Sequence, residues 1–267
     1  MKIFETHAHY EDEAFDNDRE ELLQEIHDND VEIIVNIGTN VALSEESIEL
    51  AKTYDFIYAA VGIHPEYPEE GLIGENIEKI EKMLDYEKTV AIGEIGLDYH
   101  YENTDEIKKM QKETFRAQLD LAVKYGFPIV VHSRDATQDT LDIIKEYYGK
   151  NSHNKLACPG VIHCFSASEE IAKEYVKMGF MIGIGGACTW KKANRLKRVI
   201  ENTPLQNIIL ETDCPYQTPE PHRGKRNSSL YLHFVCEKIA EILGLDPEEV
   251  AKVTFENSMR MYSKIGE

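Results

Sequence analysis

The chain has 267 residues, a hydrophobic fraction of 42% and a formal net charge of −20. This length suits one large domain or two small ones, and α/β barrels reach it as single domains. The negative charge excludes broad capture of DNA or RNA by a basic face, but not an enzyme that acts on nucleic acid at one small, metal-lined mouth.

Strand-like and helix-like segments alternate along the whole chain. The eight predicted strands are 2–7, 31–37, 57–63, 89–94, 128–132, 160–163, 180–184 and 207–211. Helical segments fall between all of them, and this alternation predicts an α/β fold, a single (β/α)8 barrel that spans residues 1–267. An open doubly wound sheet is the alternative, but His7-Ala8-His9 stands where that fold normally has a glycine-rich phosphate turn.

Local signals predict several helix ends and one loop. The run 104–125 has apolar residues at helical spacing, and Gly126 is predicted to end it. Asp246 before Pro247 predicts a helix N-terminus, and the tail from Asp246 is expected to form two short helices packed against the barrel. The glycine-rich segment 183–186 is expected to permit a tight loop, with phosphate contact as the alternative.

Residues that bind metals follow the predicted strands at several points. They are His7 and His9 at the end of the first strand, and then His64, Glu94, His132, His163 and Asp213. Because the carboxyl ends of barrel strands converge on one mouth, these side chains are expected to meet there. Imidazoles and carboxylates gathered in this way are ligands for one or two transition metals. The pattern therefore predicts a metal-dependent hydrolase, with a polar core network as the alternative.

Glu94 is the most unusual of these residues, since it lies in the apolar stretch 91–99. An ionised and unpaired carboxylate in such surroundings would cost several kcal/mol. Two metals bridged by its two oxygens would remove this cost. The alternative is a buried salt bridge to Arg134, and for Asp213 alone the alternative is the cap of a turn.

The cysteines and the N-terminus indicate the compartment. The five cysteines are widely spaced and form no C-x-x-C motif: Cys158, Cys164, Cys188, Cys214 and Cys236. This favours a reduced chain, with packing expected for Cys164 and Cys214 and soft metal ligation as the alternative. The chain begins with a strand-like segment and no leader, and no apolar run approaches the ~20 residues of a membrane span. A cytoplasmic location is therefore expected.

Seven motifs together resemble a known family. They are H-A-H at 7–9, G-I-H-P at 62–65, G-E-I-G-L-D-Y at 93–99, H-S-R at 132–134, H-C-F at 163–165, E-T-D-C-P-Y at 211–216 and P-H-R-G-K-R-N at 221–227. In this order they are similar to the signature of TatD-type metal-dependent deoxyribonucleases, over essentially the whole chain. Glu5 departs from the family pattern, which usually has aspartate before the H-x-H pair.

The resemblance implies a TIM barrel of the metal-dependent hydrolase type, with two divalent cations as cofactors. One cation would be held by His7, His9, Glu94 and Asp213, and the other by Glu94, His132 and His163. Imidazole-rich sites suit Zn, Mn, Co or Ni, whereas the resemblance implies activity supported by Mg. Asp213 and Glu94 are the expected catalytic residues, with Asp213 as general base for a water that attacks phosphorus in line.

Four further residues are candidates for contacts to the substrate phosphate: His64, Arg134, His222 and Arg223. Arginine offers a planar donor fork that suits phosphate, although Arg134 has a structural pairing with Glu94 or Asp213 as its alternative. His222 and Arg223 lie in a proline-rich loop after the eighth strand, where barrels often bind phosphate.

The leading hypothesis is a 3′-to-5′ exodeoxyribonuclease, or a general phosphodiesterase, that acts as a monomer on single-stranded DNA ends and also on RNA. The same site would also suit hydrolysis of esters, lactones or amides, including aminoacyl esters on tRNA. A third interpretation is a non-catalytic metal-binding partner protein with an acidic docking surface. Aromatic residues near the mouth are expected mostly to pack the loops, with base stacking as the alternative: Tyr99, Phe165, Trp190 and Tyr216.

Overall fold

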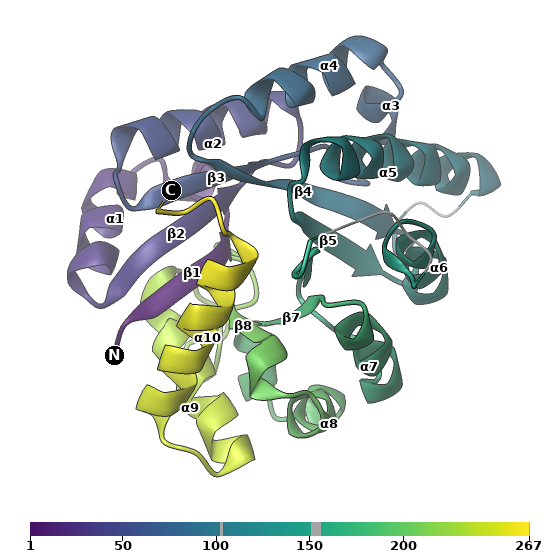
Figure 1. The fold of residues 1–267 in the computed structure, drawn as a ribbon. Coiled ribbons are helices and arrows are strands. Elements are labelled where there is room, and N and C mark those ends of the chain that lie inside the picture. Colours follow the sequence, from purple (N-terminus) through teal and green to yellow (C-terminus); the bar gives the residue numbers. More distant parts are fainter. Residues whose placement is uncertain (102–103, 151–155, 267) are drawn as a thin grey trace.

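The computed structural model describes residues 1–101, 104–150 and 156–266. Its eight strands are all parallel and follow one another in chain order, from β1 to β8. An isolated parallel bridge between Ala8 and Cys214 joins the first strand to the segment after the last. The sheet therefore closes almost completely. Figure 1 shows the helices arranged around the strands. The predicted (β/α)8 TIM barrel is confirmed, and the doubly wound alternative is excluded.

Each strand lies close to its predicted position. The strands are β1 (Ile3–Ala8), β2 (Val31–Ile37), β3 (Ile57–Val61), β4 (Thr89–Asp98), β5 (Ile129–Arg134), β6 (Gly160–Ile162), β7 (Met181–Ile184) and β8 (Ile208–Leu210). The largest difference is in β4, which continues past Glu94 to Asp98, because residues 95–98 pair in register with residues 131–134 of β5. This pairing places Glu94 inside a strand rather than at its end.

Helices separate the strands along most of the chain. They are α1 (Arg19–Asp28), α2 (Val41–Thr53), α3 (Pro68–Gly71), α4 (Gly74–Met83), α5 (Asp105–Tyr125), α6 (Thr137–Tyr148), α7 (Glu169–Lys177), α8 (Asn194–Asn202), α9 (Leu232–Leu243) and α10 (Pro247–Met261). Short 3-10 turns are η1 (Glu13–Phe15), η2 (Gly186–Thr189), η3 (Leu205–Asn207) and η4 (Ser229–Tyr231). As predicted, α5 ends at Gly126, whose φ of 71° lies in the left-handed region that glycine adopts without strain.

The tail differs from the prediction of two short helices after Asp246. Asp246 caps the backbone N–H of Glu248, and Pro247 opens the helix as expected, but α10 then runs unbroken to Met261. No glycine or proline interrupts this stretch, and its buried side chains recur every three to four residues, so one continuous face packs against the barrel. In Figure 1 α10 lies alongside β1 and β8.

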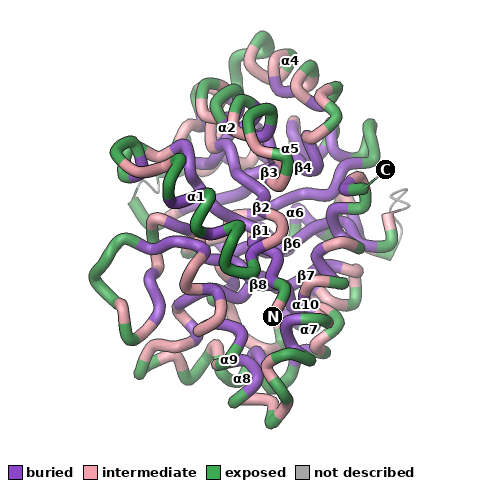
Figure 2. The backbone as a smooth tube through the Cα atoms, turned by 90° about the vertical axis from the view of Figure 1, so that its left-hand side faces the viewer, coloured by how far each residue is buried: buried purple, intermediate pink, exposed green. Residues whose placement is uncertain are grey.

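The core is made of the strands and the inward faces of the helices. Figure 2 shows buried residues along the strands and many exposed residues on outer helices such as α1 and α4. The C-terminal segment joins the strand core through Tyr262, which stacks on Phe4 at 5.8 Å and donates a hydrogen bond to the carbonyl oxygen of Thr6 at 2.9 Å. The barrel is therefore a packed body, with buried polar residues such as Glu5, Asn36 and Glu94 within its strands.

Candidate metal centre

The barrel brings the six predicted metal ligands together. They come from five strands or the residues just after them: His7 and His9 from β1, Glu94 from β4, His132 from β5, His163 after β6 and Asp213 after β8. Sequence separations of up to about 200 residues are bridged because parallel strands end on the same side of the barrel. The side chains are largely buried, and the most exposed of them are Asp213 at 14% and His132 at 18%.

The carboxylate of Glu94 divides these ligands into two groups. Its Oε2 lies 3.3 Å from Nε2 of His7 and 3.8 Å from Nε2 of His9. Its Oε1 lies 2.9 Å from Nδ1 of His132 and 3.7 Å from Nε2 of His163. Oε1 also lies 3.6 Å from Nε2 of His64, so each oxygen faces its own group of imidazoles. No ion pair joins Glu94 to Arg134 in the part of the chain that the structure describes, so Arg134 is not its partner in a buried salt bridge. The groups of opposite charge around Glu94 are the imidazoles.

Asp213 completes one of the groups with a single oxygen. Its Oδ1 lies 3.5 Å from Nε2 of His9, 3.6 Å from Nε2 of His163 and 3.8 Å from Nε2 of His7. Its backbone has a φ of 59°, in the left-handed region that residues other than glycine, asparagine and aspartate rarely adopt. The loop after β8 is thus bent so that this carboxylate turns inward to the imidazoles.

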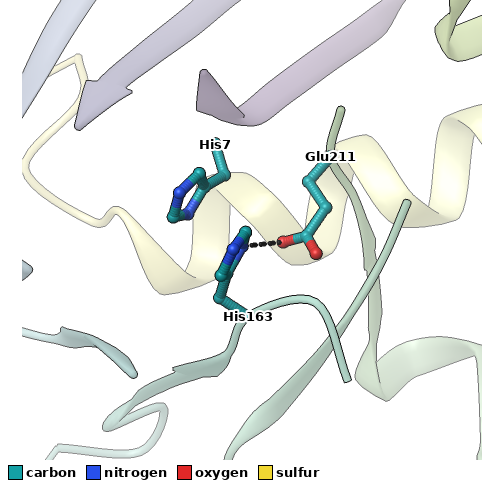
Figure 3. Close-up of side chains that lie close together, drawn as sticks. All are labelled: His7, His163 and Glu211. Atoms are coloured by element: carbon teal, nitrogen blue, oxygen red, sulfur yellow. Dashed lines mark hydrogen bonds and ion pairs between the residues drawn. The ribbon is translucent and has the colours of Figure 1, made fainter. Parts of the chain in front are cut away.

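The imidazole rings lie so close together that the lone pairs of their nitrogen atoms would repel one another without a proton or cation between them. His7 lies face to face with His163, with ring centroids 3.4 Å apart (Figure 3). Its Nε2 is 3.1 Å from Nε2 of His9, and its buried Nδ1 has no hydrogen-bond partner. Nitrogen lone pairs that converge in this way need a proton or a cation between them. This donor set of imidazoles and carboxylates fits zinc, manganese, cobalt or nickel.

Groups behind the ligands fix which nitrogen of each ring faces the site. Nδ1 of His9 lies 2.9 Å from the carbonyl oxygen of Ile37, and that oxygen can only accept a hydrogen bond. Nδ1 of His163 lies 3.2 Å from Oε2 of Glu211. With the proton held on Nδ1, each ring presents the lone pair of Nε2 inward, which is the tautomer a metal requires.

Glu211 is a further candidate functional residue, outside the set expected from the sequence. It is fully buried, and its Oε1 also accepts the backbone N–H of Cys164 at 2.6 Å. A Cβ atom on Gly183 would lie 2.4 Å from its Oε2, so a side chain there would collide with the carboxylate. Figure 3 shows Glu211 pointing at His163 from the β8 end. The E-T-D sequence at 211–213 places a second acid beside Asp213, just after β8, and this is the sequence signal for Glu211.

Asp98 is a second such residue, and it acts on His132. Its Oδ2 lies 2.9 Å from Nε2 of His132, on the side of the ring opposite Glu94. The backbone N–H of His100 and the side chain of Gln111 hold the Asp98 segment in place. His132 therefore has its Nδ1 directed to the site and its Nε2 directed to a buried acid.

The charges of these groups depend on one another. Burial alone would lower the pKa of His163 and His132, but the neighbouring carboxylates raise both values to about 9. Burial alone would raise the pKa of Glu94 and Asp213, but the imidazoles, His163 first, lower both. Without metal, the site therefore holds protonated imidazoles against ionised carboxylates. Divalent cations would replace those protons.

His64 lies at this cluster but has a different tautomer. Its Nδ1 accepts a hydrogen bond from the backbone N–H of Glu66 at 3.2 Å, so the neutral ring carries its proton on Nε2. That nitrogen lies 3.6 Å from Oε1 of Glu94. Burial and the nearby His132 lower the pKa of His64 to about 3, so the ring is neutral at ordinary pH. His64 thus directs a hydrogen-bond donor, rather than a lone pair, toward the site.

The other candidate substrate contacts rest on aromatic rings. The Arg134 guanidinium lies 4.9 Å from the ring centre of Tyr101, and that of Arg223 lies 4.4 Å from the ring of Trp190. His222 stacks on Tyr231 with centroids 4.5 Å apart. Within the described residues, no ion pair links Arg134 to Glu94 or Asp213.

The aromatic residues near the mouth mostly pack the loops, as expected. Phe165 is buried, the hydroxyl of Tyr99 donates to Asp139, and the indole N–H of Trp190 donates to the carbonyl oxygen of Thr218. Tyr216 is the exception, because 56% of it is exposed.

The five cysteines are free, and two of them differ in their surroundings. Cys214 is fully buried, as expected for a packing residue. The thiol of Cys164 lies 3.7 Å from Oδ2 of Asp213 and within hydrogen-bond distance of the Gln217 amide. Cys164 therefore borders the centre, and its thiol lies within 4.8 Å of ligand atoms of His163 and Asp213, so the alternative of soft metal ligation stays open.

Glu5, which replaces the aspartate expected at its position, is fully buried behind the ligands. It accepts hydrogen bonds from the backbone N–H groups of His7 and Thr212 and from the hydroxyls of Thr212 and Ser229. Burial raises its pKa to about 7. The longer glutamate thus ties β1 to the segment that carries Asp213.

Comparison with known proteins identifies relatives along almost the whole chain. The model of the family described as TatD related DNase matches residues 4–263. A Bacillus subtilis protein named uncharacterized metal-dependent hydrolase YabD is 41% identical over 97% of this chain and 98% of its own length. The Escherichia coli K12 protein named uncharacterized metal-dependent hydrolase YcfH is 31% identical over 98% of this chain and 96% of its own.

Solved structures agree with this match. The TatD homologue YJJV from Escherichia coli has a TM-score of 0.87 and 28% sequence identity, with 98% of each chain covered. An uncharacterized amidohydrolase from Saccharomyces cerevisiae has a TM-score of 0.83 at 17% identity, which shows a shared fold alone. None of the helices in the described ranges is both long and apolar enough to cross a membrane.

Proposed function

Because this chain belongs to the TatD-related DNase family of metal-dependent hydrolases, we propose that it is a two-metal phosphodiesterase that trims single-stranded DNA from the 3′ end. The observation that carries the proposal is the division of Glu94, whose two oxygens face two different groups of imidazoles. A carboxylate placed in this way suits a bridge between two cations.

The proposed ligand sets follow this division. His7, His9, Glu94 and Asp213 would hold one cation, and Glu94, His132 and His163 the other. Two divalent cations, drawn from Mg, Mn, Zn, Co and Ni, would supply an activated water and neutralise charge on the phosphoryl oxygens. All six ligands can meet within one chain, and we propose that it acts as a monomer. The free cysteines support a reducing, cytoplasmic location.

Asp213 is the proposed general base. Its Oδ1 is directed into the centre, and the neighbouring imidazoles keep its pKa low, so that it is ionised at neutral pH. An ionised carboxylate oxygen at this place can accept the proton of the attacking water. The imidazoles also hold the pKa of Glu94 well below its usual range against the effect of burial, so Glu94 is ionised as well. Its proposed role is to hold the two groups of ligands together.

Substrate binding is assigned to donors around the centre. His64 offers its Nε2–H toward the site, where a neutral donor can bind a phosphate oxygen. Arg134 and Arg223 offer guanidinium groups that suit phosphate, and each is steadied by an aromatic ring. His222 is proposed for the same task, although its ring now stacks on Tyr231.

The test is digestion of 3′- and 5′-labelled single-stranded DNA by metal-stripped protein, with Mg, Mn, Zn or no metal added back. Metal-dependent shortening from the 3′ end, lost in Glu94→Gln, is the expected result. Metal bound per chain is measured in parallel by elemental analysis, with two ions expected. If metal-loaded protein leaves DNA and RNA intact but hydrolyses esters, lactones or amides, the phosphodiesterase proposal is wrong.

A further inference from the structure

The outer oxygen of Asp213 has a partner of its own. Gln217, four residues further along the loop after β8, places its side-chain Nε2 2.9 Å from Oδ2 of Asp213. The same Nε2 lies 2.7 Å from Sγ of Cys164, and that thiol is itself 3.7 Å from Oδ2. Oδ2 therefore accepts hydrogen bonds from two neutral groups, while Oδ1 faces the imidazoles.

The position of Gln217 is fixed by its neighbours in the loop. Its φ is 53°, so the chain turns sharply there. The carbonyl oxygen of Tyr216 on one side accepts a hydrogen bond from the side chain of Asn227. The carbonyl oxygen of Thr218 on the other side accepts one from the indole of Trp190. The backbone is therefore held on both sides of Gln217, and the side-chain amide itself is held by Asp213 and Cys164.

The Gln217 amide carries no charge, and this determines how much of the negative charge of Asp213 remains available to a cation. An arginine or lysine in its place would pair with Asp213 as a charge and compete with a cation for the carboxylate. An amide N–H instead holds one oxygen and leaves the negative charge available to the other. A carboxylate without this partner is free to turn and to offer both oxygens to a single cation.

We propose that Gln217 is a positioning residue that restricts Asp213 to binding metal through Oδ1 alone. The inference rests on the proposed metal centre, in which Asp213 is both a ligand and the general base. By occupying Oδ2, Gln217 keeps Oδ1 directed at the shared space between His9 and His163. Partners of this kind, one step behind a metal ligand, typically change metal affinity by 10- to 100-fold when they are removed.

The experiment compares wild type with Gln217→Met, which keeps the length of the side chain but has no donor. Gln217→Gly removes the side chain and tolerates the left-handed backbone, so it controls for the turn. Asp213→Ala is the reference for loss of the ligand. Each protein is titrated with Co²⁺, and calorimetry gives the affinity while the visible absorption spectrum reports the coordination of the ion. Thermal unfolding of the metal-free proteins is measured alongside.

We expect Gln217→Met and Gln217→Gly to bind one Co²⁺ at least about tenfold more weakly, with altered absorption bands and an unchanged unfolding temperature. On bis(p-nitrophenyl) phosphate, kcat should fall while KM stays within about twofold.

Two outcomes separate the possible failures. Wild-type affinity and spectrum in both Gln217 variants, together with loss of binding in Asp213→Ala, would overturn the role of Gln217 and leave the metal centre intact. If wild type and Asp213→Ala bind Co²⁺ alike, the proposed metal centre is itself wrong, and the role of Gln217 falls with it.

Discussion

His7 and His163 lie face to face, with their ring centroids 3.4 Å apart and their planes inclined by only 15°. Two protonated imidazoles at this distance would repel each other strongly. Burial and the nearby His163 lower the pKa of His7, while the carboxylates around His163 raise its pKa to about 9. One ring of the pair is therefore neutral and the other carries a proton until a metal replaces it.

Metal binding should release protons at neutral pH. His163 and His132 both have a pKa of about 9 in the metal-free site, and Asp213 and Glu11 raise the pKa of His9 well above its usual range against the effect of burial. All three rings must lose a proton to become ligands. We expect about three protons to leave at pH 7 and fewer near pH 10, so that affinity rises with pH between these values. Calorimetry with Mn²⁺ in buffers of different ionisation enthalpy measures this number. Binding at pH 7 that is independent of the buffer would contradict the prediction.

Loss of the Glu211 carboxylate should weaken the metal centre without removing a ligand. Glu211→Gln leaves an amide beside Nδ1 of His163 and the N–H of Cys164, where the carboxylate now accepts both. We expect metal affinity to fall by about 10- to 100-fold. Gly183→Ala is the companion variant, because its methyl group would displace the carboxylate without changing its charge. Unchanged metal affinity in both variants would show that Glu211 is structural only.

Stability of the metal-free protein should depend on Glu5 between pH 4.5 and 7. Burial raises the pKa of Glu5 from 4.5 to about 7, so the folded state holds its proton at pH values where the unfolded chain has lost it. The unfolded chain binds fewer protons in this window, and stability therefore falls as pH rises through it. The fall is on the order of 3 kcal/mol.

The measurement is urea unfolding of metal-stripped protein at pH 4.5 and pH 8. Glu5→Gln cannot ionise, so its free energy of unfolding should change less with pH than that of wild type. Because the histidines titrate in both proteins, the difference between the two slopes isolates Glu5. Equal slopes would contradict the prediction.

Arg223 should affect substrate binding rather than the chemical step. Its guanidinium lies over the ring of Trp190, in the loop proposed to contact phosphate. For Arg223→Ala we expect KM for a DNA oligonucleotide to rise several-fold with little change in kcat, because a distant phosphate contact is made equally before and during the reaction. Lys225→Ala, an exposed cation in the same loop, is the matched control. Equal effects of the two variants would indicate general attraction by the loop's charge.

The barrel was predictable because its signals are local. Apolar runs and helical spacing mark each strand and helix along the chain, and parallel strands must end on one side. The meeting of His7, His163 and Asp213 follows from that rule, whereas Glu94 lies inside β4. The prediction of two short helices after Asp246 failed because it depended on a contact that is not local. The single helix α10 is stabilised along its length by packing its buried face against the barrel.

The amino-acid sequence by itself thus determined the barrel, the order of its strands and the set of residues gathered at their ends. Only the tertiary structure decided which oxygen of Glu94 faces which imidazole, and which ring nitrogen Glu211 holds. It also decided that Gln217 reaches Asp213 and that Arg134 lies on Tyr101 instead of pairing with Glu94. The physical reason is the distance along the chain over which each signal acts. The periodicity of strands and helices is set by residues close together in the sequence. Hydrogen bonds between loops join residues far apart in the sequence, and the ångström-scale distances they need are fixed only in the closed barrel.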